Sequence, residues 1–405
     1  MKTIKGISIR LDKFSQAKYL NDCILHEKSQ GSNELSVQIL ESTSYSNVCA
    51  PIAWIIDFYR TQGMKILVHC PRDSYASRLH ISNPRPIEEI DAPLSPFDKI
   101  FTFSTEEGVA KIVNLYVLAL RESAELETGI IQSLEWCMNE SIDNVLQHSC
   151  SDKGFVMAQL HKQSKTFCFC VFDYGLGIYN SLRNSKHAPT TPLQAITLAM
   201  SERITRDENI GQGNGLWGLS NIIKEANGRL LISSGGARYL FNNGNEQQVE
   251  TGDFNLGRQH GTTIVDFQLN YSTPIDVARA LNGYEPTDFW AEQHENENGQ
   301  IEIDVASQAN GTGTRRSAER LKNIVVNFLK GGHSPIILDF QNVRIISSSF
   351  ADELIGKLIG TLGFSKFMQH IVISNVNDFN EAVINRSVGQ RMAQIFMGER
   401  IVEED

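Results

Sequence analysis

The chain has 405 residues, of which 41% are hydrophobic and 21% are charged, and its formal net charge is -10. This composition is normal for a folded protein. The chain is longer than one ordinary domain, so we expect two or three domains. The acidic balance argues against a nucleic-acid partner, which requires a basic surface, and no apolar run is long enough to cross a membrane.

The seven cysteines include no Cys-x-x-Cys pair, and the first six residues lack the apolar core of a signal peptide. Cys168 and Cys170 alternate with phenylalanines in a predicted strand, so both thiols point to one face of it. We expect buried, reduced thiols rather than a metal site or a disulfide. The sequence therefore predicts a cytoplasmic location.

Residues 1–100 are expected to form a small α/β domain. The hydrophobic pattern predicts strands at 35–40 and 65–69, with a helix at 50–59 between them. The proline-rich segment 84–96 predicts a linker, since proline interrupts both helix and sheet.

Residues 101–275 are expected to form the central domain. Its predicted helical segments are 104–148 with interruptions, the polar stretch 179–211, and a helix after Gly218. Its predicted strands are 155–160, 166–172, 230–233, 239–241 and 262–269. A layer of helices on a mostly antiparallel sheet is the natural architecture for this order of elements.

The polar, acidic segment 276–300 predicts a linker, and residues 301–405 predict another α/β domain. The elements expected in this last domain are a helix at 317–329, a strand at 335–340, a helix at 350–362 and a strand at 371–374. The order of strand, serine-rich turn, helix and strand also describes residues 37–69. An internal structural repeat that flanks the central domain is therefore a hypothesis.

Glu140 and Asn144 lie four residues apart where the helical pattern is strongest, so both occupy one face of the helix. A carboxylate there can polarise a water or a hydroxyl, while a carboxamide oxygen suits Mg²⁺, which prefers oxygen ligands. The alternative interpretation is an amphipathic helix with a solvated acidic face.

Asp173 follows an apolar strand and opens a turn that contains Gly175 and Gly177. Its carboxylate can accept a hydrogen bond from the exocyclic amine of adenine, while the glycines let the backbone approach the ring. An ordinary tight turn that closes a strand is the alternative.

Gly213, Gly215 and Gly218 satisfy the pattern G-x-G-x-x-G. A dinucleotide fingerprint needs a strand directly before it, and the preceding segment 201–212 is polar and charged instead. Backbone amides at a helix N-terminus that face phosphates fit this segment better.

Four segments, in this order, resemble the sequence boxes of the GHKL ATPases, the group that contains gyrase, MutL and the histidine kinases. They are 139–148, 173–178, 213–219 and 260–263. The resemblance spans about residues 105–270 and implies a Bergerat α/β sandwich that binds ATP and Mg²⁺. Trp217 departs from the usual spacing of the second glycine box.

The resemblance also implies roles for single residues. Glu140 would be the catalytic base, Asn144 the Mg²⁺ ligand, and Asp173 the reader of adenine. The remaining nucleotide-binding positions would be Gly175, Gly177, Gly213, Gly215, Gly218 and Thr262. Segment 179–212 would be the lid over the phosphates, with Lys186, Arg203 and Arg206 as candidates to meet phosphate charge.

Segments 337–340 and 345–354 resemble the STAS-like domains, relatives of the anti-sigma-factor antagonists. In the antagonists, a GHKL-type kinase phosphorylates a serine at this strand-to-helix turn. Ser349 aligns best with that serine, and Ser348 is next. A serine at the start of a helix is also simply a good N-cap, which is the alternative reading of this turn.

These patterns predict a cytosolic ATP-binding regulatory protein with a central GHKL domain between small STAS-like domains. It would use MgATP to switch STAS-like modules or to phosphorylate them on serine, in cis or on a partner. A slow ATPase that works as a conformational clamp and a nucleotide sensor without turnover are the alternatives. We expect a protein partner or a homodimer through the STAS-like domains, and neither nucleic acid nor membrane. No histidine lies between His80 and His148, which argues against histidine autokinase activity.

Overall fold

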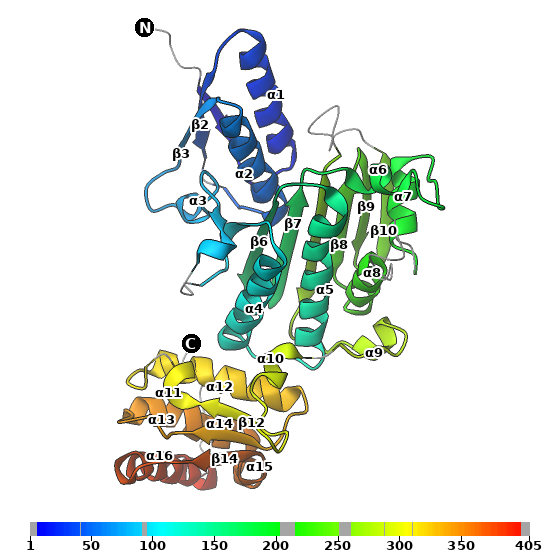
Figure 1. Cartoon of the computed structure of the whole chain (residues 1–405). Coiled ribbons are helices and arrows are strands. Elements are labelled where there is room, and N and C mark those ends of the chain that lie inside the picture. The colour runs from blue at the N-terminus through cyan, green and yellow to red at the C-terminus, as the bar shows by residue number, and fades with distance from the viewer. Residues whose placement is uncertain are drawn as a thin grey trace. The chain divides into compact units, whose positions relative to one another are not determined.

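The computed structural model describes residues 6–40, 42–90, 95–202, 215–250, 261–286, 288–309 and 311–397. Helices alternate with three sheets, so the predicted α/β fold class is confirmed (Figure 1). Contacts group the chain into two compact units. The first unit comprises residues 1–116 and 132–286, and the second comprises residues 117–131 and 287–405.

The first unit begins with a small parallel sheet. Its strands, in spatial order, are β1 (Gly6–Ile9), β2 (Glu34–Ile39) and β3 (Lys65–His69). The helices α1 (Ser15–Ser29) and α2 (Ser46–Thr61) make the crossovers that parallel strands require. The sequence pattern indicates β2, α2 and β3 but not β1, which has only four residues, or α1, whose apolar stripe is weak. We call residues 6–69 the N-terminal module.

A second sheet of eight strands dominates the first unit. Its spatial order is β10 (Asn245–Glu250), β9 (Ala237–Asn242), β8 (Arg229–Ser234), β11 (Thr263–Asn270), β7 (Thr166–Asp173), β6 (Gly154–His161), β5 (Lys99–Phe103) and β4 (Arg85–Pro86). Every pair of neighbours is antiparallel except β4 and β5. The mostly antiparallel sheet expected from the sequence is thus present.

The remaining helices of the first unit follow or precede these strands. They are α3 (Tyr75–Arg78), α6 (Gly177–Leu182), α7 (Pro192–Ala199), α8 (Gly215–Glu225) and α9 (Val277–Ala280). Two long helices, α4 (Glu106–Ser123) and α5 (Ile130–Asn144), each have one end in the first unit and the other end in the second. A π-helical turn, Val145–Ser149, continues α5.

The eight-stranded sheet is covered on both faces. On one face, Phe169 of β7 contacts Tyr116 of α4, with ring centroids 6.1 Å apart. On the other face, Cys170 and Phe172 belong to the same buried cluster as the apolar side of α2. Because side chains alternate along a strand, this division of β7 follows from its sequence. The expected domain of residues 1–100 therefore shares a core with the large sheet.

The two segments expected to be linkers contain ordered elements. Residues 84–90 form β4 and a 3₁₀ turn, Ile87–Glu89, with Ile87 buried. Within 276–300, α9 belongs to the first unit, and α10 (Phe289–Glu292) buries Trp290 in the second. A few apolar side chains among many polar ones suffice for this packing, and their wide spacing gives no periodic signal.

The second unit contains a three-stranded parallel sheet with strands in the order β12 (Ile301–Asp304), β13 (Ile336–Asp339) and β14 (Ile371–Ser374). Its further helices are α11 (Val305–Gln308), α12 (Arg315–Lys330), α13 (Ser348–Ala351), α14 (Lys357–Leu362), α15 (Phe364–His370) and α16 (Asp378–Met397), with a π-helical turn, Asp352–Gly356, between α13 and α14. The predicted elements of this region correspond to α12, β13, α13–α14 and β14.

The N-terminal module and the second unit share a strand order and an alternation of strands and helices. In both, a serine-rich turn precedes the helix after the second strand, at Ser42–Ser46 and at Ser347–Ser349. The element that packs on that helix differs between the two parts. The large sheet packs on α2, whereas α16 packs on α13 and α14. The two parts thus have a strand order and a serine-rich turn in common, and the internal repeat stays a prediction.

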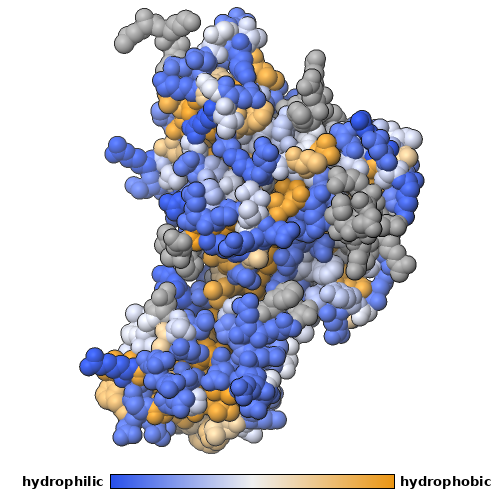
Figure 2. All heavy atoms as spheres, viewed as in Figure 1, coloured by the Kyte–Doolittle hydropathy of each residue, from blue (hydrophilic) through white to orange (hydrophobic). Residues whose placement is uncertain are grey.

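The face of the molecule in Figure 2 is largely hydrophilic, and its apolar residues form limited patches. Among the described helices, none has both the length and the apolar character needed to span a bilayer.

Candidate functional site

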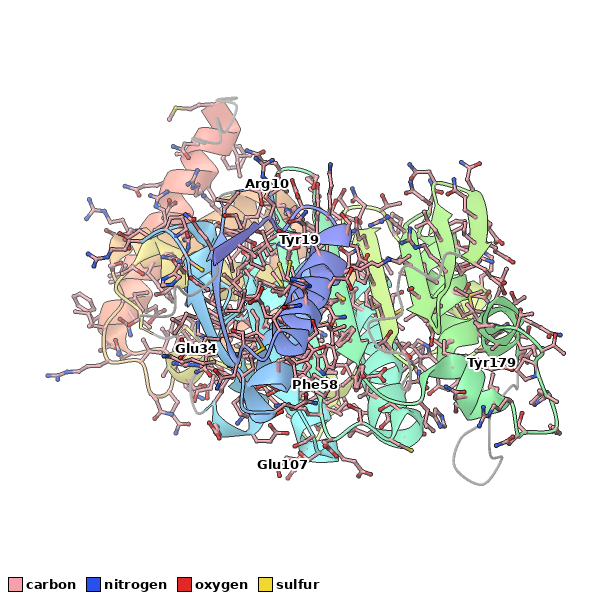
Figure 3. The ribbon with its side chains drawn as sticks, turned by 90° about the horizontal axis from the view of Figure 1, so that it is seen from above. Arg10, Tyr19, Glu34, Phe58, Glu107 and Tyr179 are labelled. Atoms are coloured by element: carbon pink, nitrogen blue, oxygen red, sulfur yellow. The ribbon has the colours of Figure 1, made fainter. Side chains whose placement is uncertain are left out.

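A cavity of about 460 Å³ lies in the first unit. Its walls come from α5 and the π-helical turn, the end of β7, α6, the start of α8, and β11. Tyr179 marks the position of α6 in Figure 3. Five residues singled out by the sequence line the cavity: Glu140, Asn144, Asp173, Gly177 and Gly215.

The end of α5 supplies Glu140 and Asn144, one turn apart. The Asn144 Nδ2 donates to the Glu140 carbonyl oxygen at 2.6 Å, so the carboxamide oxygen remains as an acceptor. Directly after Asn144 the helix changes to the π-helical turn and ends at Cys150 in the left-handed region. Such turns are frequent at functional sites, and no sequence pattern indicated this one.

Glu140 is held in a confined place. Burial raises the pKa of its carboxyl to about 7, and the nearby charge of Asp143 adds to the effect. A Cβ on Gly215, the first residue of α8, would collide with Glu140 Oε2. The glycine at this position therefore lets the N-terminus of α8 approach the carboxyl group. Near neutral pH this group can both donate and accept a proton.

Asp173 ends β7 and is only 5% exposed. Burial raises the pKa of its carboxyl to about 7, although hydrogen bonds from the Gly175 N–H and the Thr263 hydroxyl lower the pKa in part. The Gly175 nitrogen lies 2.9 Å from Asp173 Oδ1. Thr263 is the direct neighbour of Asp173 across the ladder between β11 and β7. These two donors fix the orientation of the carboxylate.

The glycines of the predicted site have different roles. Gly177 lines the cavity with φ of +71°, a conformation that favours glycine. Gly175 and Gly218 are not among the lining residues. A Cβ on Gly175 would collide with the Ser149 carbonyl, and one on Gly218 would lie 2.8 Å from Trp136 Nε1, so both positions allow close packing. Gly213 lies outside the described residues.

Thr262 is buried but does not line the cavity, whereas its neighbour Thr263 does. Of the three lid cations suggested by the sequence, Arg203 and Arg206 lie outside the described ranges, and Lys186 is not part of the lining.

Other lining residues have no counterpart in the sequence patterns. Val171 of β7 and Val265 of β11 form part of an apolar wall of the cavity. Val171 is two residues from Asp173, and Val265 is two residues from Thr263, so each pair points to the same face of its strand. Trp136 and Tyr284 form an aromatic pair with centroids 5.4 Å apart. The spacing from Trp136 to Glu140 is one helical turn, which could have indicated a shared face. Tyr284 comes from the segment that looked like a linker.

Within the described residues, no group of three His, Cys, Asp or Glu side chains could hold a metal ion. The carboxamide oxygen of Asn144 is the expected protein ligand for Mg²⁺. This donor set does not make a closed cage. It fits an ion that retains waters and is bound mainly through phosphate oxygens, which is usual for Mg²⁺.

The serine-rich turn of the second unit has a mixed character. Ser347 caps α13, since its Oγ accepts from the Phe350 N–H at 3.1 Å. Its Oγ also lies 2.9 Å from that of Ser349, which is half-buried. Ser348 is exposed. The capping role thus belongs to Ser347, and the two candidate acceptors differ in accessibility.

Comparison with known protein families bears on this second unit. Residues 317–380 match a STAS-like domain of unknown function (DUF4325). The match runs from α12 to the start of α16 and includes the serine-rich turn, so the predicted C-terminal STAS-like domain is confirmed. No curated protein and no solved structure matches the chain.

Proposed function

We propose that the first unit is a GHKL-type nucleotide domain that binds MgATP. The observation that carries the proposal is the shared cavity lined by Glu140, Asn144 and Asp173, which come from two distant motifs. Its volume of about 460 Å³ suits a small-molecule site, for which roughly 300–1,000 Å³ is usual.

The adenine end of the site is at the end of β7. There the carboxylate of Asp173 accepts from the exocyclic amine, while Val171 and Val265 offer apolar contact to the ring. The hydrogen bonds from Gly175 and Thr263 hold the carboxylate in place before the ligand arrives. A carboxylate fixed beside the exocyclic amine of adenine disfavours guanine in the same orientation, because guanine has a carbonyl oxygen at that position.

The phosphate end is between α5 and the start of α8. Backbone N–H groups at a helix N-terminus favour negative charge, and Gly215 at the start of α8 leaves room beside Glu140. Asn144 would hold Mg²⁺ through its carboxamide oxygen, and the ion would supply the neutralisation of phosphate charge that phosphoryl transfer requires.

For the reaction, we propose transfer of the γ-phosphoryl group to a serine of a STAS-like module, in cis or on a partner. The serine Oγ forms a bond to the γ-phosphorus as the bond from that phosphorus to the β–γ bridging oxygen breaks, and ADP leaves. Glu140 takes the serine proton, and a carboxyl pKa of about 7 suits that task near neutral pH. Ser348 and Ser349 are the acceptor candidates on this chain.

Titration calorimetry with MgATP tests the binding. We expect the wild type to bind and Asp173→Asn to lose about tenfold or more in affinity, because the amide would turn a donor toward the adenine amine. Asp276→Asn is the matched control, since Asp276 is an exposed N-cap of α9 and asparagine caps equally well. A well-folded wild type without measurable binding would contradict the proposal.

Phosphosite mapping by mass spectrometry after incubation with MgATP tests the reaction. We expect phosphoserine at Ser348 or Ser349, loss of it in Glu140→Gln, and retention in Glu107→Gln, which changes an exposed residue of α4 (Figure 3). Phosphate release without phosphoserine would instead favour the ATPase clamp. Binding without either product would favour the nucleotide sensor.

A further inference from the structure

Tyr174 connects the proposed adenine site to the N-terminal module. It follows Asp173 directly, and because side chains alternate at the end of a strand, its ring lies on the face of the sheet opposite the cavity. There it stacks on Trp54 of α2, with ring centroids 4.1 Å apart and an interplanar angle of 24°. Phe58, one turn further along α2, lies 5.3 Å from the same ring.

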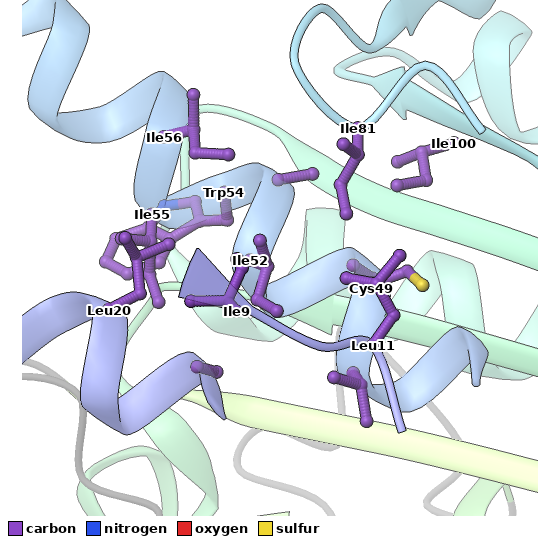
Figure 4. Packing of buried hydrophobic residues seen from close by; sticks show 14 of the residues in the cluster. Ile9, Leu11, Leu20, Cys49, Ile52, Trp54, Ile55, Ile56, Ile81 and Ile100 are labelled. Carbon is purple, nitrogen blue, oxygen red and sulfur yellow. The ribbon is translucent and has the colours of Figure 1, made fainter. Parts of the chain in front are cut away.

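Trp54 is the centre of this aromatic cluster. Its indole is 6% exposed and also contacts Phe172 of β7 at 5.5 Å and Phe58 at 4.9 Å. Figure 4 shows Trp54 near Ile52, Ile55 and Ile56 of α2, which belong to the core cluster of the N-terminal module. The indole therefore bridges the module's core and the last residues of β7.

The turn after β7 is also held from its cavity side. The Leu176 N–H donates to the Ser149 carbonyl at 2.6 Å, and the Ile178 N–H donates to Ser234 Oγ at 2.9 Å. These bonds fix the end of the turn, whereas the aromatic stack holds its beginning at Tyr174. The peptide that joins Asp173 to Tyr174 lies between Asp173 and the stack, so its orientation depends on both.

We propose that Trp54 is a positioning residue for the nucleotide: by holding Tyr174 from behind the sheet, it fixes the carboxylate of Asp173 for adenine. The proposal rests on the proposed function. Removal of the indole leaves space behind Tyr174, the turn relaxes into it, and the Asp173 carboxyl loses its fixed direction and gains water. The N-terminal module thus contributes to nucleotide affinity although none of its residues lines the described cavity.

The test measures adenosine and MgATP affinity by calorimetry, across a pH series, on the full-length chain. We expect Trp54→Leu to weaken adenosine binding about tenfold, whereas Trp54→Phe, which preserves a stacked ring, retains most of the affinity. Tyr174→Leu should produce a similar loss, and adding it to Trp54→Leu should cost little more, because both variants break one contact. Tyr174 is half-buried, so this variant provides the same readout should Trp54→Leu not fold.

The pH series separates positioning from general stability. In the wild type, adenosine affinity should rise with pH as Asp173 ionises, because burial raises the pKa of this carboxyl to about 7. The other titratable groups that line the cavity are Glu140, Asp143, His148 and Tyr284. In Trp54→Leu the midpoint of this rise should move to lower pH, since a hydrated carboxyl ionises more readily.

Ile24→Ala is the matched control, because Ile24 is a fully buried residue of α1 in the same core cluster. It should lower the melting temperature and leave both affinity and the pH midpoint unchanged. If Trp54→Leu behaves like this control, the positioning role is refuted while the nucleotide site stands. If the folded wild type binds neither adenosine nor MgATP, the proposed function fails, and the positioning role fails with it.

Discussion

Glu140 and Asp173 share one property, because burial raises the pKa of each carboxyl to about 7. A carboxyl with a raised pKa favours the folded state only while it is protonated. Below about pH 4 both the folded and the unfolded chain bind the proton, and between about pH 4 and about pH 7 only the folded chain does. The stabilising contribution of each group is thus lost as the pH rises through this window. At and above about pH 7, where Asp173 is ionised and can accept from adenine, the two buried carboxyl groups of the unliganded protein therefore contribute least to the free energy of unfolding.

Adenosine binding should depend on pH through Asp173. The ionised carboxylate accepts from the adenine amine, so affinity should increase about tenfold between about pH 6 and about pH 8. Adenosine is the suitable probe because it has no phosphate to interact with Glu140, and a Glu140→Gln background removes the titration of that carboxyl. Calorimetry across this range measures the change. A flat profile in the wild type would contradict the role of Asp173 ionisation, whereas a pH dependence that persists in Asp173→Asn would assign the titration to another group.

Sequence patterns singled out Glu140, Asn144 and Asp173 as candidate site residues, and all three line the cavity. The spacing of the first two and the place of Asp173 after a strand can be seen without a structure. The choice between Thr262 and Thr263 could not be made in this way. The side-chain period of a strand is two, so a shift by one residue changes which threonine faces the cavity. The register of β11 on β7 settles this point, and it places Thr263 opposite Asp173. The sequence likewise could not show that Gly175 and Gly218 serve close packing, whereas Gly177 and Gly215 line the cavity.

Among the secondary-structure elements, α2 is packed between two sheets. It packs on its own parallel sheet and on the large sheet, so apolar residues surround most of it. The sequence predicted the helix from this apolar pattern, but its second partner depends on tertiary contacts. Strand β10 was missed for the opposite reason. All six of its side chains are exposed and most are polar, so it has no apolar alternation to detect.

In the second unit, Asn327 of α12 fixes the turn between α4 and α5. Its Oδ1 accepts from the Leu126 N–H at 2.7 Å, and its Nδ2 donates to the carbonyl oxygens of Arg121 and Ala124. Asn327→Ala should leave these buried groups unpaired and lower the free energy of unfolding by about 2–4 kcal/mol. Chemical denaturation measures the loss. Asn342→Ala, at an exposed loop position, should change stability by less than about 0.5 kcal/mol.

At the scale of the whole molecule, the two units are not consecutive pieces of the chain. Residues 117–131, which contain the end of α4 and the start of α5, belong to the second unit. Arg121 is 1% exposed there, pairs with Asp288, and lies about 5 Å from the rings of Trp290 and Phe328. The sequence suggested boundaries at linkers, and it could not show that a helical hairpin of the central region contributes to the C-terminal core.

A truncated chain tests this organisation. Residues 1–286 alone should aggregate or melt without a sharp transition, because the buried guanidinium of Arg121 would lose its partner and its aromatic neighbours. Co-expression with residues 287–405 should restore solubility, and the two pieces should elute together in size-exclusion chromatography. A monomeric fragment 1–286 with a cooperative melting transition would show that residues 117–131 do not depend on the second unit.

The two edges of the eight-stranded sheet have a consequence for solubility. One edge is β4, only two residues long and ending in Pro86, which has no N–H to donate. The other edge is β10, whose exposed side chains include Glu246 and Glu250. Short strands, proline and charge are the features by which natural sheets resist edge-to-edge aggregation. Within the described residues, both edges of the eight-stranded sheet thus have features that oppose the addition of strands from other chains.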